Sequence, residues 1–124
     1  MPQDIVVALV TAPSREEAES LARTLVAEHL AACANIVPSV VSVYRWKGSI
    51  ETDEEVLLFL KTRRLLLDRL IERVQELHSY EVPEVIALPL AGGSADYVRW
   101  VKKETERAVR ELPRDRRGPF GPGF

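Results

Sequence analysis

Few side chains in this 124-residue sequence suit a soft metal ion, and Cys33 and His78 are the main candidates. A cysteine thiolate and a histidine imidazole are typical ligands of copper and related metals. The two residues lie far apart in the sequence, so only the fold could bring them together. Two structural roles stay open beside the metal role. A lone cysteine often packs as a small buried hydrophobe, and a histidine at a helix C-terminus interacts with the helix dipole.

Two carboxylates lie in a short segment after the second predicted helix. Glu81 and Glu84 flank Pro83 there. Oxygen ligands suit hard divalent cations, so the candidate metal ligands are His78, Cys33, Glu81 and Glu84. Copper or another divalent cation is the expected cofactor, and no organic cofactor is expected. The alternatives for the two glutamates are solvated side chains or contacts with Lys47 or Lys61.

A second group of residues is suited to a small anion. Trp46 and Lys47 occupy a predicted turn, Lys61 ends an apolar run, and Tyr80 lies in the loop after the second helix. Tyr and Trp combine an apolar ring with a polar tip, and lysines attract anions. These four residues therefore predict a ligand cleft between subunits, with core or interface aromatics as the alternative. Lys61 has no glycine-rich phosphate loop beside it, so no nucleotide site is predicted.

Composition and motifs exclude several functions. Lys and Arg number 17 against 19 Asp and Glu, a net charge of -2, which disfavours a broad basic face for nucleic acid. A single cysteine excludes an internal disulfide and an all-cysteine zinc site. No apolar run approaches the roughly 20 residues of a membrane span, and no signal-peptide pattern is present, so we expect a cytoplasmic protein with no membrane partner. Common catalytic motifs are missing, and we expect no enzyme.

Hydrophobic periodicity predicts the elements that position these residues. Short β-branched runs predict strands, and apolar residues three and four positions apart predict helices. Ser14 and Glu17 have the spacing of a capping box, which begins a helix. Pro38 predicts a bend or an edge position in its strand. In order, the predicted elements are a strand at 5–10, a helix to about 29, strands at 34–46 and 56–60, a helix at 67–78, a strand at 85–90 and a helix at 97–111.

This order of elements has few compact solutions. Two right-handed β-α-β units that pair into one antiparallel sheet give a ferredoxin-like β-α-β-β-α-β sandwich of the α+β class, here with an additional C-terminal helix. The two main helices then cover one sheet face, and the third helix covers part of the other. Because the rest of that face is apolar, we expect another subunit to cover it. Residues 1–112 form this domain, and residues 113–124 form a Pro/Gly/Arg-rich tail.

Six short motifs follow one another along the chain. They are ACANIVP at 32–38, YRWKG at 44–48, KT at 61–62, HSYEVPE at 78–84, ALP at 87–89 and YVRWV at 97–101. Together they closely resemble the CutA divalent-cation tolerance family, from about Ile5 to about Val109. The resemblance implies ferredoxin-like subunits in a tight homotrimer with long hairpins paired across subunits. It also implies a role in tolerance to copper and other divalent cations, and an architecture similar to the PII signalling proteins.

The sequence departs from the family at positions implicated in copper binding. Some members have a cysteine and a second histidine where this sequence has Val10 and Leu77, so only His78 remains of that set. Ser79 replaces a proline that is common in the loop. Three hypotheses stay open: a trimeric metal-binding protein that contributes to ion homeostasis, a sensor that binds a small anion between subunits, and a scaffold for an unknown protein partner.

Overall fold

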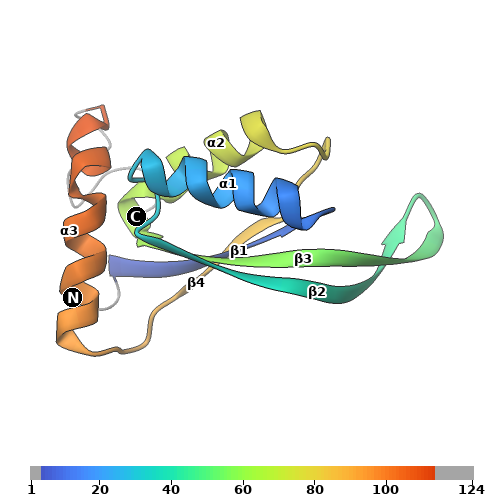
Figure 1. Cartoon of the computed structure of the whole chain (residues 1–124), viewed down its shortest axis with the longest axis horizontal. Helices are drawn as coiled ribbons and strands as arrows, with labels where there is room; N and C mark the ends of the chain where they lie inside the picture. The colour runs from blue at the N-terminus through green and yellow to red at the C-terminus, as the bar shows by residue number, and fades with distance from the viewer. Residues whose placement is uncertain (1–3, 114–124) are drawn as a thin grey trace.

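The computed structural model describes residues 4–113, which form four strands and three α-helices (Figure 1). In order, the elements are β1 (Ile5–Ala12), α1 (Arg15–Ala27), β2 (Cys33–Trp46), β3 (Ser49–Arg63), a short 3-10 helix (Arg64–Leu66), α2 (Leu67–Leu77), β4 (Val85–Pro89) and α3 (Ala95–Glu111). The predicted order of elements is confirmed, with bounds that differ by one or two residues, except that β3 begins and ends well outside the predicted strand at 56–60. The predicted tail at 113–124 lies outside the described residues except for Pro113.

The four strands form one antiparallel sheet in the order β2-β3-β1-β4. Helices α1 and α2 both lie on one face of this sheet, which is the predicted ferredoxin-like arrangement (Figure 1). Alternate strand residues point toward these helices, and Val10 of β1 and Leu58 of β3 are 1% and 0% exposed. They share one core with Leu25 and Leu70 of the helices. This core fixes the strand register, because a slip by one residue would turn the apolar side chains outward.

The start of α1 follows the predicted cap only in part. Ser14 caps the helix, since its Oγ accepts a 3.2 Å hydrogen bond from the Glu17 amide. The Glu17 carboxylate turns to the loop after α2 instead, where its Oε2 accepts from the amide and the hydroxyl of Ser79 at 3.0 and 2.9 Å. The helix ends before the predicted position because His29 has a φ of 62°, in the left-handed region. Glu17 therefore anchors the loop that follows α2.

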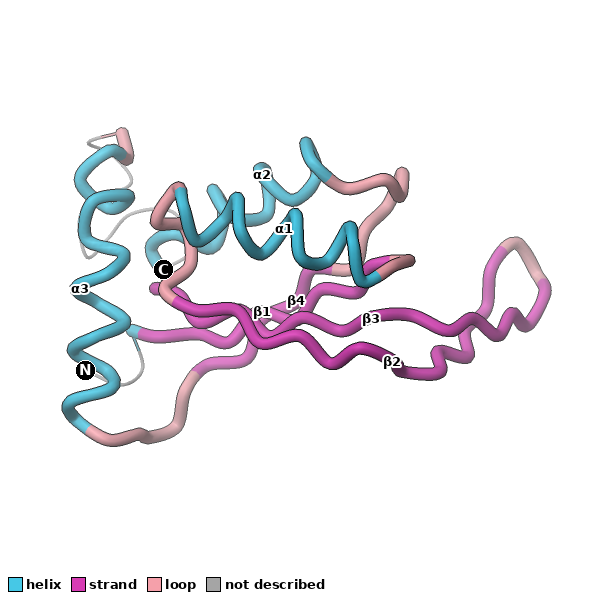
Figure 2. Tube along the Cα trace, in the orientation of Figure 1, coloured by secondary structure: helices cyan, strands magenta, loops and turns pink. Residues whose placement is uncertain are grey.

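Strands β2 and β3 form a hairpin that extends well beyond the helices (Figure 2). Its two-residue turn has Lys47 at a φ of 49° and Gly48 at a φ of 83°, the left-handed values that suit a tight hairpin. The pairing register shifts between Val37 and Val40, beside Pro38, so the predicted bend is present as a bulge. Since β2 is also an edge strand, the proline interrupts no central ladder.

Among residues 4–113, no helix lies over most of the second face of the sheet (Figure 1, Figure 2). Helix α3 stands across one end of the sheet, where its Val98 and Val101 pack against Ile5. Ile86 and Leu88 of β4 stay 55% and 58% exposed. The residues that point to this side are largely apolar: Val7, Leu9, Val37, Leu57, Phe59, Ile86 and Leu88. The third helix therefore covers part of this face, as predicted, and leaves an apolar surface that we call the uncovered face.

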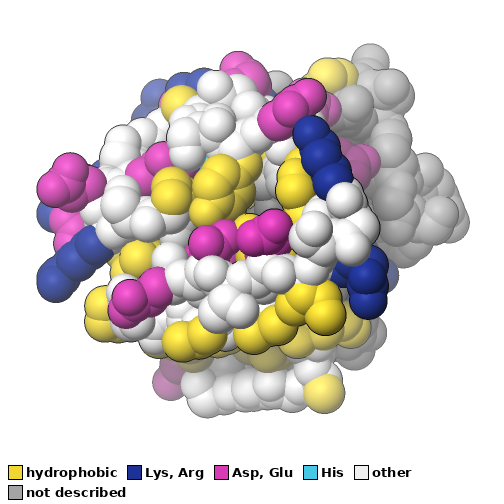
Figure 3. All heavy atoms as spheres, turned by 90° about the vertical axis from the view of Figure 1, so that its right-hand side faces the viewer, with side chains coloured by type: hydrophobic (Ala, Val, Ile, Leu, Met, Phe, Trp, Pro, Cys, Tyr) yellow, Lys and Arg dark blue, Asp and Glu magenta, His cyan; other side chains and the backbone are white. Residues whose placement is uncertain are grey.

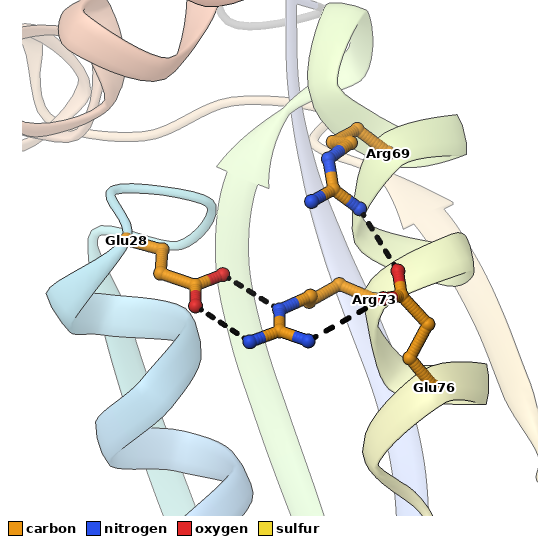
Figure 4. Close-up of polar contacts among 4 residues, drawn as sticks. All are labelled: Glu28, Arg69, Arg73 and Glu76. Carbon is orange, nitrogen blue, oxygen red and sulfur yellow. Dashed lines mark hydrogen bonds and ion pairs between the residues drawn. The ribbon is translucent and has the colours of Figure 1, made fainter.

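An ion-pair network ties the end of α1 to α2 (Figure 4). Arg73 donates two hydrogen bonds of 2.8 Å to the Glu28 carboxylate. Glu76 lies 3.5 Å from Arg73 and 3.3 Å from Arg69. The hydrogen bonds from Arg73 lower the pKa of Glu28. Because a bidentate arginine–carboxylate pair fixes orientation as well as distance, this network holds the two helices in place over the sheet.

Candidate functional site

The structure separates Cys33 from the other candidate metal ligands. Cys33 begins β2 on the uncovered face, in register with Lys61 of β3. Its Sγ is 3.9 Å from the Lys61 ammonium and 4.0 Å from Oδ1 of Asn35, which also accepts a hydrogen bond from Lys61. Burial, together with the neighbouring Cys33 thiol, raises the pKa of Tyr97 on α3. Cys33 thus belongs to a small polar cluster beside α3.

His78 follows α2 directly, and its side chain is fully buried. Its Nδ1 accepts a 3.0 Å hydrogen bond from the Tyr80 amide, so Nε2 carries the hydrogen and donates at 2.7 Å to the Thr11 carbonyl. Both ring nitrogens are engaged, and neither offers a free lone pair to a metal ion in this arrangement. Thr11 lies near the end of β1, whereas Cys33 lies beside its beginning. The fold therefore does not bring His78 and Cys33 together.

Glu81 and Glu84 line a pocket of about 610 Å³ where the loop after α2 meets the hairpin. Carboxylates and aromatic rings supply most of its lining: Asp53, Glu55, Glu81, Glu84, Tyr44, Trp46 and Tyr80. From the hairpin end of the molecule, acidic side chains lie beside hydrophobic ones across the middle of the view (Figure 3). Within the described part of the chain, no Lys, Arg or His lines this pocket. We call it the acidic pocket.

Two tyrosine hydroxyls orient the carboxylates of β3 in the acidic pocket. Tyr80 donates a 2.8 Å hydrogen bond to Oε2 of Glu55, and Tyr44 donates to Oδ2 of Asp53. Burial and the hydrogen bond to Glu55 raise the pKa of Tyr80, while the hydrogen bond to Asp53 raises the pKa of Tyr44 to about 12. Glu55 is only 8% exposed. No cationic side chain among residues 4–113 forms an ion pair with this largely buried carboxylate.

The four residues predicted to hold an anion do not gather in one place. Trp46 and Tyr80 line the acidic pocket. Lys47 lies at the hairpin turn with its ammonium 5.8 Å from the Trp46 ring centroid, and Lys61 lies on the uncovered face beside Cys33. The charged groups that line the pocket beside Trp46 and Tyr80 are therefore carboxylates and not the predicted lysines. This lining attracts cations and repels anions.

The hairpin residues that form the hydrogen bonds of the acidic pocket were not identified from the sequence: Tyr44, Asp53 and Glu55. The hairpin register places them on one side of the ribbon, because directly opposed residues share a face. A signal was available, since Glu51, Asp53 and Glu55 alternate along one strand and so share a face. The sequence did not indicate that the loop after α2 folds against that face and closes a pocket.

The candidate ligands of one chain do not fit a complete metal site. Among residues 4–113, no three His, Cys, Asp or Glu side chains are grouped closely enough to hold an ion. His78 is engaged in hydrogen bonds and Cys33 lies elsewhere, which leaves Glu81 and Glu84 as the accessible oxygen donors. A hard divalent cation such as Ca²⁺ or Mg²⁺ takes six or more oxygen ligands, so water or a second copy of the chain would have to supply the others.

A second pocket, of about 620 Å³, lies where the ends of α1 and α3 approach α2. Three arginines line it, and each forms an ion pair with a glutamate: Arg69 with Glu76, Arg73 with Glu28 and Arg107 with Glu111. Because these positive charges already have partners, an anion would have to displace them. The ion pairs account for this region as a structural contact between helices.

The fold and the acidic pocket define a small ferredoxin-like α+β protein with a projecting hairpin, one uncovered sheet face and a carboxylate-lined cleft. No helix among the described residues is long and apolar enough to span a membrane. The family described as CutA1 divalent ion tolerance protein matches residues 6–104. The chain belongs to this family.

Relatives and solved structures agree with this assignment. The chain is 52% identical over 100 residues to "Protein CutA, chloroplastic" of Arabidopsis thaliana, a match that covers 81% of this chain and 55% of that protein. It is 48% identical to the divalent-cation tolerance protein CutA of Thermus thermophilus, over 80% of this chain and 96% of that protein. The Thermus structure has a TM-score of 0.80 and covers 82% of this chain and 98% of its own. The chain thus spans about half the length of the Arabidopsis protein.

Proposed function

We propose that this chain forms a homotrimer that binds divalent cations, copper among them, and contributes to cation tolerance without catalysing a reaction. The observation that carries the proposal is the acidic pocket, whose charged lining consists of carboxylates alone within the described residues. Membership of the CutA1 family supports it, as does the name of the Thermus relative, a divalent-cation tolerance protein.

Glu81 and Glu84 are the ligands that we assign to a hard divalent cation. Both lie in the loop after α2, both line the acidic pocket, and carboxylate oxygens suit such ions. For copper, Cys33 is the candidate soft ligand. Because His78 is engaged on both ring nitrogens, a copper site at Cys33 would take its further ligands from another copy of the chain.

The uncovered face and the hairpin support the trimer. Ile86 and Leu88 are more than half exposed on the sheet, and Val41, Val43 and Ile50 are 70%, 66% and 69% exposed on the hairpin. Apolar surface of this extent on a soluble chain typically marks a protein–protein contact. In our proposal three copies cover these faces, and each hairpin packs on a neighbour beside its acidic pocket.

Titration of the full chain with Cu²⁺, Zn²⁺ and Mn²⁺, followed by calorimetry, tests the proposal. We expect saturable binding that is weakened about tenfold or more when Glu81→Gln and Glu84→Gln are combined. Glu16→Gln, at an exposed site on α1, is the control of equal charge change and should bind as the unaltered chain does. If none of the metals shows saturable binding to a chain that remains folded and assembled, the metal proposal is wrong.

The cytoplasm remains our prediction for the compartment, and fractionation of the source cells with an antibody to this chain tests it. The names of relatives vary in this respect, since the Arabidopsis protein is called chloroplastic and an Archaeoglobus fulgidus structure is described as periplasmic. Recovery of the chain in a membrane-bounded compartment would contradict the prediction.

A further inference from the structure

We propose that the acidic pocket binds an organic cation, a linear aliphatic diamine, between its carboxylates and its aromatic rings. The inference rests on the proposed function, since both require a cation in this pocket, and it names the chemical class of the ligand. Three features of the pocket support it: a buried carboxylate that has no counter-ion among residues 4–113, aromatic rings that suit an ammonium group, and a volume that exceeds the needs of a bare metal ion.

The buried carboxylate belongs to Glu55. This residue is 8% exposed, and its contact among residues 4–113 is the 2.8 Å hydrogen bond that Tyr80 donates to Oε2. A buried charge is costly unless an opposite charge compensates it. Because Glu55 lines the acidic pocket, the pocket is the route by which a cation can reach it. An ammonium group is both a positive charge and a donor of three hydrogen bonds, so it meets both requirements of this carboxylate.

The aromatic lining suits an ammonium attached to a carbon chain. Tyr44, Trp46 and Tyr80 all contribute to the pocket. The faces of Trp and Tyr attract cations, and their rings also bury methylene groups. The chain already shows this preference, because the ammonium of Lys47 lies 5.8 Å from the Trp46 ring centroid. A hydrated metal ion would gain little from such a lining, whereas an alkylammonium contacts it with both its charge and its carbon atoms.

The dimensions and the placement of the carboxylates favour two ammonium groups. The pocket holds about 610 Å³, within the range of sites for small organic ligands. Two carboxylates, Asp53 and Glu55, come from β3, and two others, Glu81 and Glu84, come from the loop after α2. No three metal-ligating groups converge within the described residues, so the four carboxylates do not gather around one point. Two pairs on two walls match a ligand with a positive charge at each end.

The hydrogen bonds of the tyrosines prepare this site. Tyr80 occupies one oxygen of Glu55, and Tyr44 occupies one oxygen of Asp53. Each carboxylate is thereby fixed in orientation while its second oxygen stays available for a donor. A preorganised carboxylate binds an incoming ammonium without the cost of ordering a flexible side chain. The two tyrosines are therefore positioning residues for the ligand as well as part of the pocket wall.

Calorimetric titration of the full assembled chain with 1,4-diaminobutane tests the proposal against three matched probes. Butylamine has one ammonium group, 1,4-butanediol has the same length without charge, and succinate has the opposite charge. We expect saturable binding of the diamine, binding of butylamine about tenfold weaker or more, and no saturable binding of the diol or of succinate. The proposal is overturned if the diamine binds no better than the diol.

Variants locate the site. Glu55→Gln and Trp46→Leu should each weaken diamine binding about tenfold. Glu54→Gln is the matched control, because Glu54 is the neighbour of Glu55 on β3, is exposed, and lies on the opposite side of the hairpin. Thermal melting and light scattering verify that each variant stays folded and assembled. Should Glu55→Gln fail to fold, Trp46→Leu at its exposed position still decides the outcome, and unchanged diamine binding by a folded Trp46→Leu variant contradicts the proposal.

Metal titrations of the same samples separate this inference from the proposed function. Saturable Cu²⁺, Zn²⁺ or Mn²⁺ binding without diamine binding would leave the metal proposal standing and would refute the diamine. Diamine binding without metal binding would do the reverse. If both bind, diamine at saturation should lower the apparent affinity for metal at Glu81 and Glu84, because the two ligands would share one pocket.

Discussion

The hydroxyl of Tyr80 lies 2.8 Å from Oε2 of Glu55, and this hydrogen bond joins the loop after α2 to the middle of β3. The two residues are far apart in the sequence, yet they form one wall of the acidic pocket. The same loop is held from its other side by Glu17 of α1, which accepts from the amide and hydroxyl of Ser79. The first turn of α1 and the central strand β3 thus both hold the loop that follows α2.

Removal of the Tyr80 hydroxyl should destabilise the fold. Tyr80→Phe keeps the ring and leaves the buried Glu55 carboxylate without its donor, so we expect a loss of about 1–3 kcal/mol in the free energy of unfolding. Chemical denaturation measures the difference. Tyr97→Phe, a change of the same chemistry at a more exposed tyrosine on α3, should cost less. Equal losses in the two variants would show that Glu55 does not depend on Tyr80.

Alkaline pH should lower the free energy of unfolding by breaking the hydrogen bond between Tyr80 and Glu55. Burial and the hydrogen bond to Glu55 raise the pKa of Tyr80 above its ordinary value. A group whose pKa is raised in the folded state stabilises the fold fully below its unfolded pKa, about 10 for tyrosine. That contribution should be lost as the pH rises from about 10 toward the folded pKa. Denaturation midpoints between pH 9 and 11.5 measure the loss, and Tyr80→Phe should show a shallower decline.

Acidic pH should weaken the ion pair between Glu28 at the end of α1 and Arg73 of α2. The hydrogen bonds from Arg73 lower the pKa of Glu28, so its contribution to stability is complete above the unfolded pKa, about 4.3 for glutamate, and is lost as the pH falls below it. Because Glu28 is about one third exposed, solvent screening limits the size of this effect. Thermal melting from pH 6 to pH 3 measures it. Arg73→Gln should flatten the decline, whereas Arg15→Gln, in an exposed pair with Glu19, should leave it unchanged.

The hairpin turn offers a stabilising substitution. Lys47 has a φ of 49°, a left-handed conformation that Asn adopts more readily than Lys. Lys47→Asn should therefore raise the free energy of unfolding by about 0.5–1 kcal/mol. Gly48→Ala should lower it by about 1 kcal/mol, because its φ is 83° although no atom lies within 4 Å of an added Cβ. A lower free energy of unfolding for Lys47→Asn, or a higher one for Gly48→Ala, would contradict the turn geometry.

A charge on the uncovered face should disrupt assembly. Leu88 is 58% exposed on β4, and Leu88→Lys would place an ammonium where we propose that another copy packs. Light scattering should then report a smaller species than the unaltered chain forms. Val26→Lys, on the helix α1 and away from this face, is the control and should leave the oligomer intact. An unaltered chain that scatters as a monomer would contradict the trimer directly.

The fold could be predicted from local patterns because each element carries its own periodicity. The Ser14 cap, the Lys47–Gly48 turn and the Pro38 bend all act within a few residues, and all three are present. The role of Glu17 was not predictable in this way. Its spacing from Ser14 suggests a local contact with the helix cap. In the folded chain its carboxylate instead accepts hydrogen bonds from the amide and the hydroxyl of Ser79, which lies far away in the sequence.

The site was harder to predict because its residues meet only in three dimensions. The sequence predicts Tyr80 and Trp46 in a cleft with Lys61, yet Lys61 lies toward the other end of β3, beside Cys33. The carboxylate of Glu55 replaced the lysine as the nearest charge to Tyr80. Glu55 and Lys61 point to the same side of β3, but they lie roughly 20 Å apart along the strand. Position along the strand therefore decides which charge lies beside Tyr80, and the sign of the expected ligand is reversed.

If the uncovered face is the surface on which copies associate, as we propose, it also determines how this chain responds to dilution. In the trimer that we propose, other copies cover its apolar residues on four strands, so mass action would enter the folding equilibrium itself. A chain whose folding is coupled to association has a melting temperature that rises with protein concentration. Newly made chains at low abundance would then be the least protected against proteases, and the accumulation of partners would progressively stabilise the population.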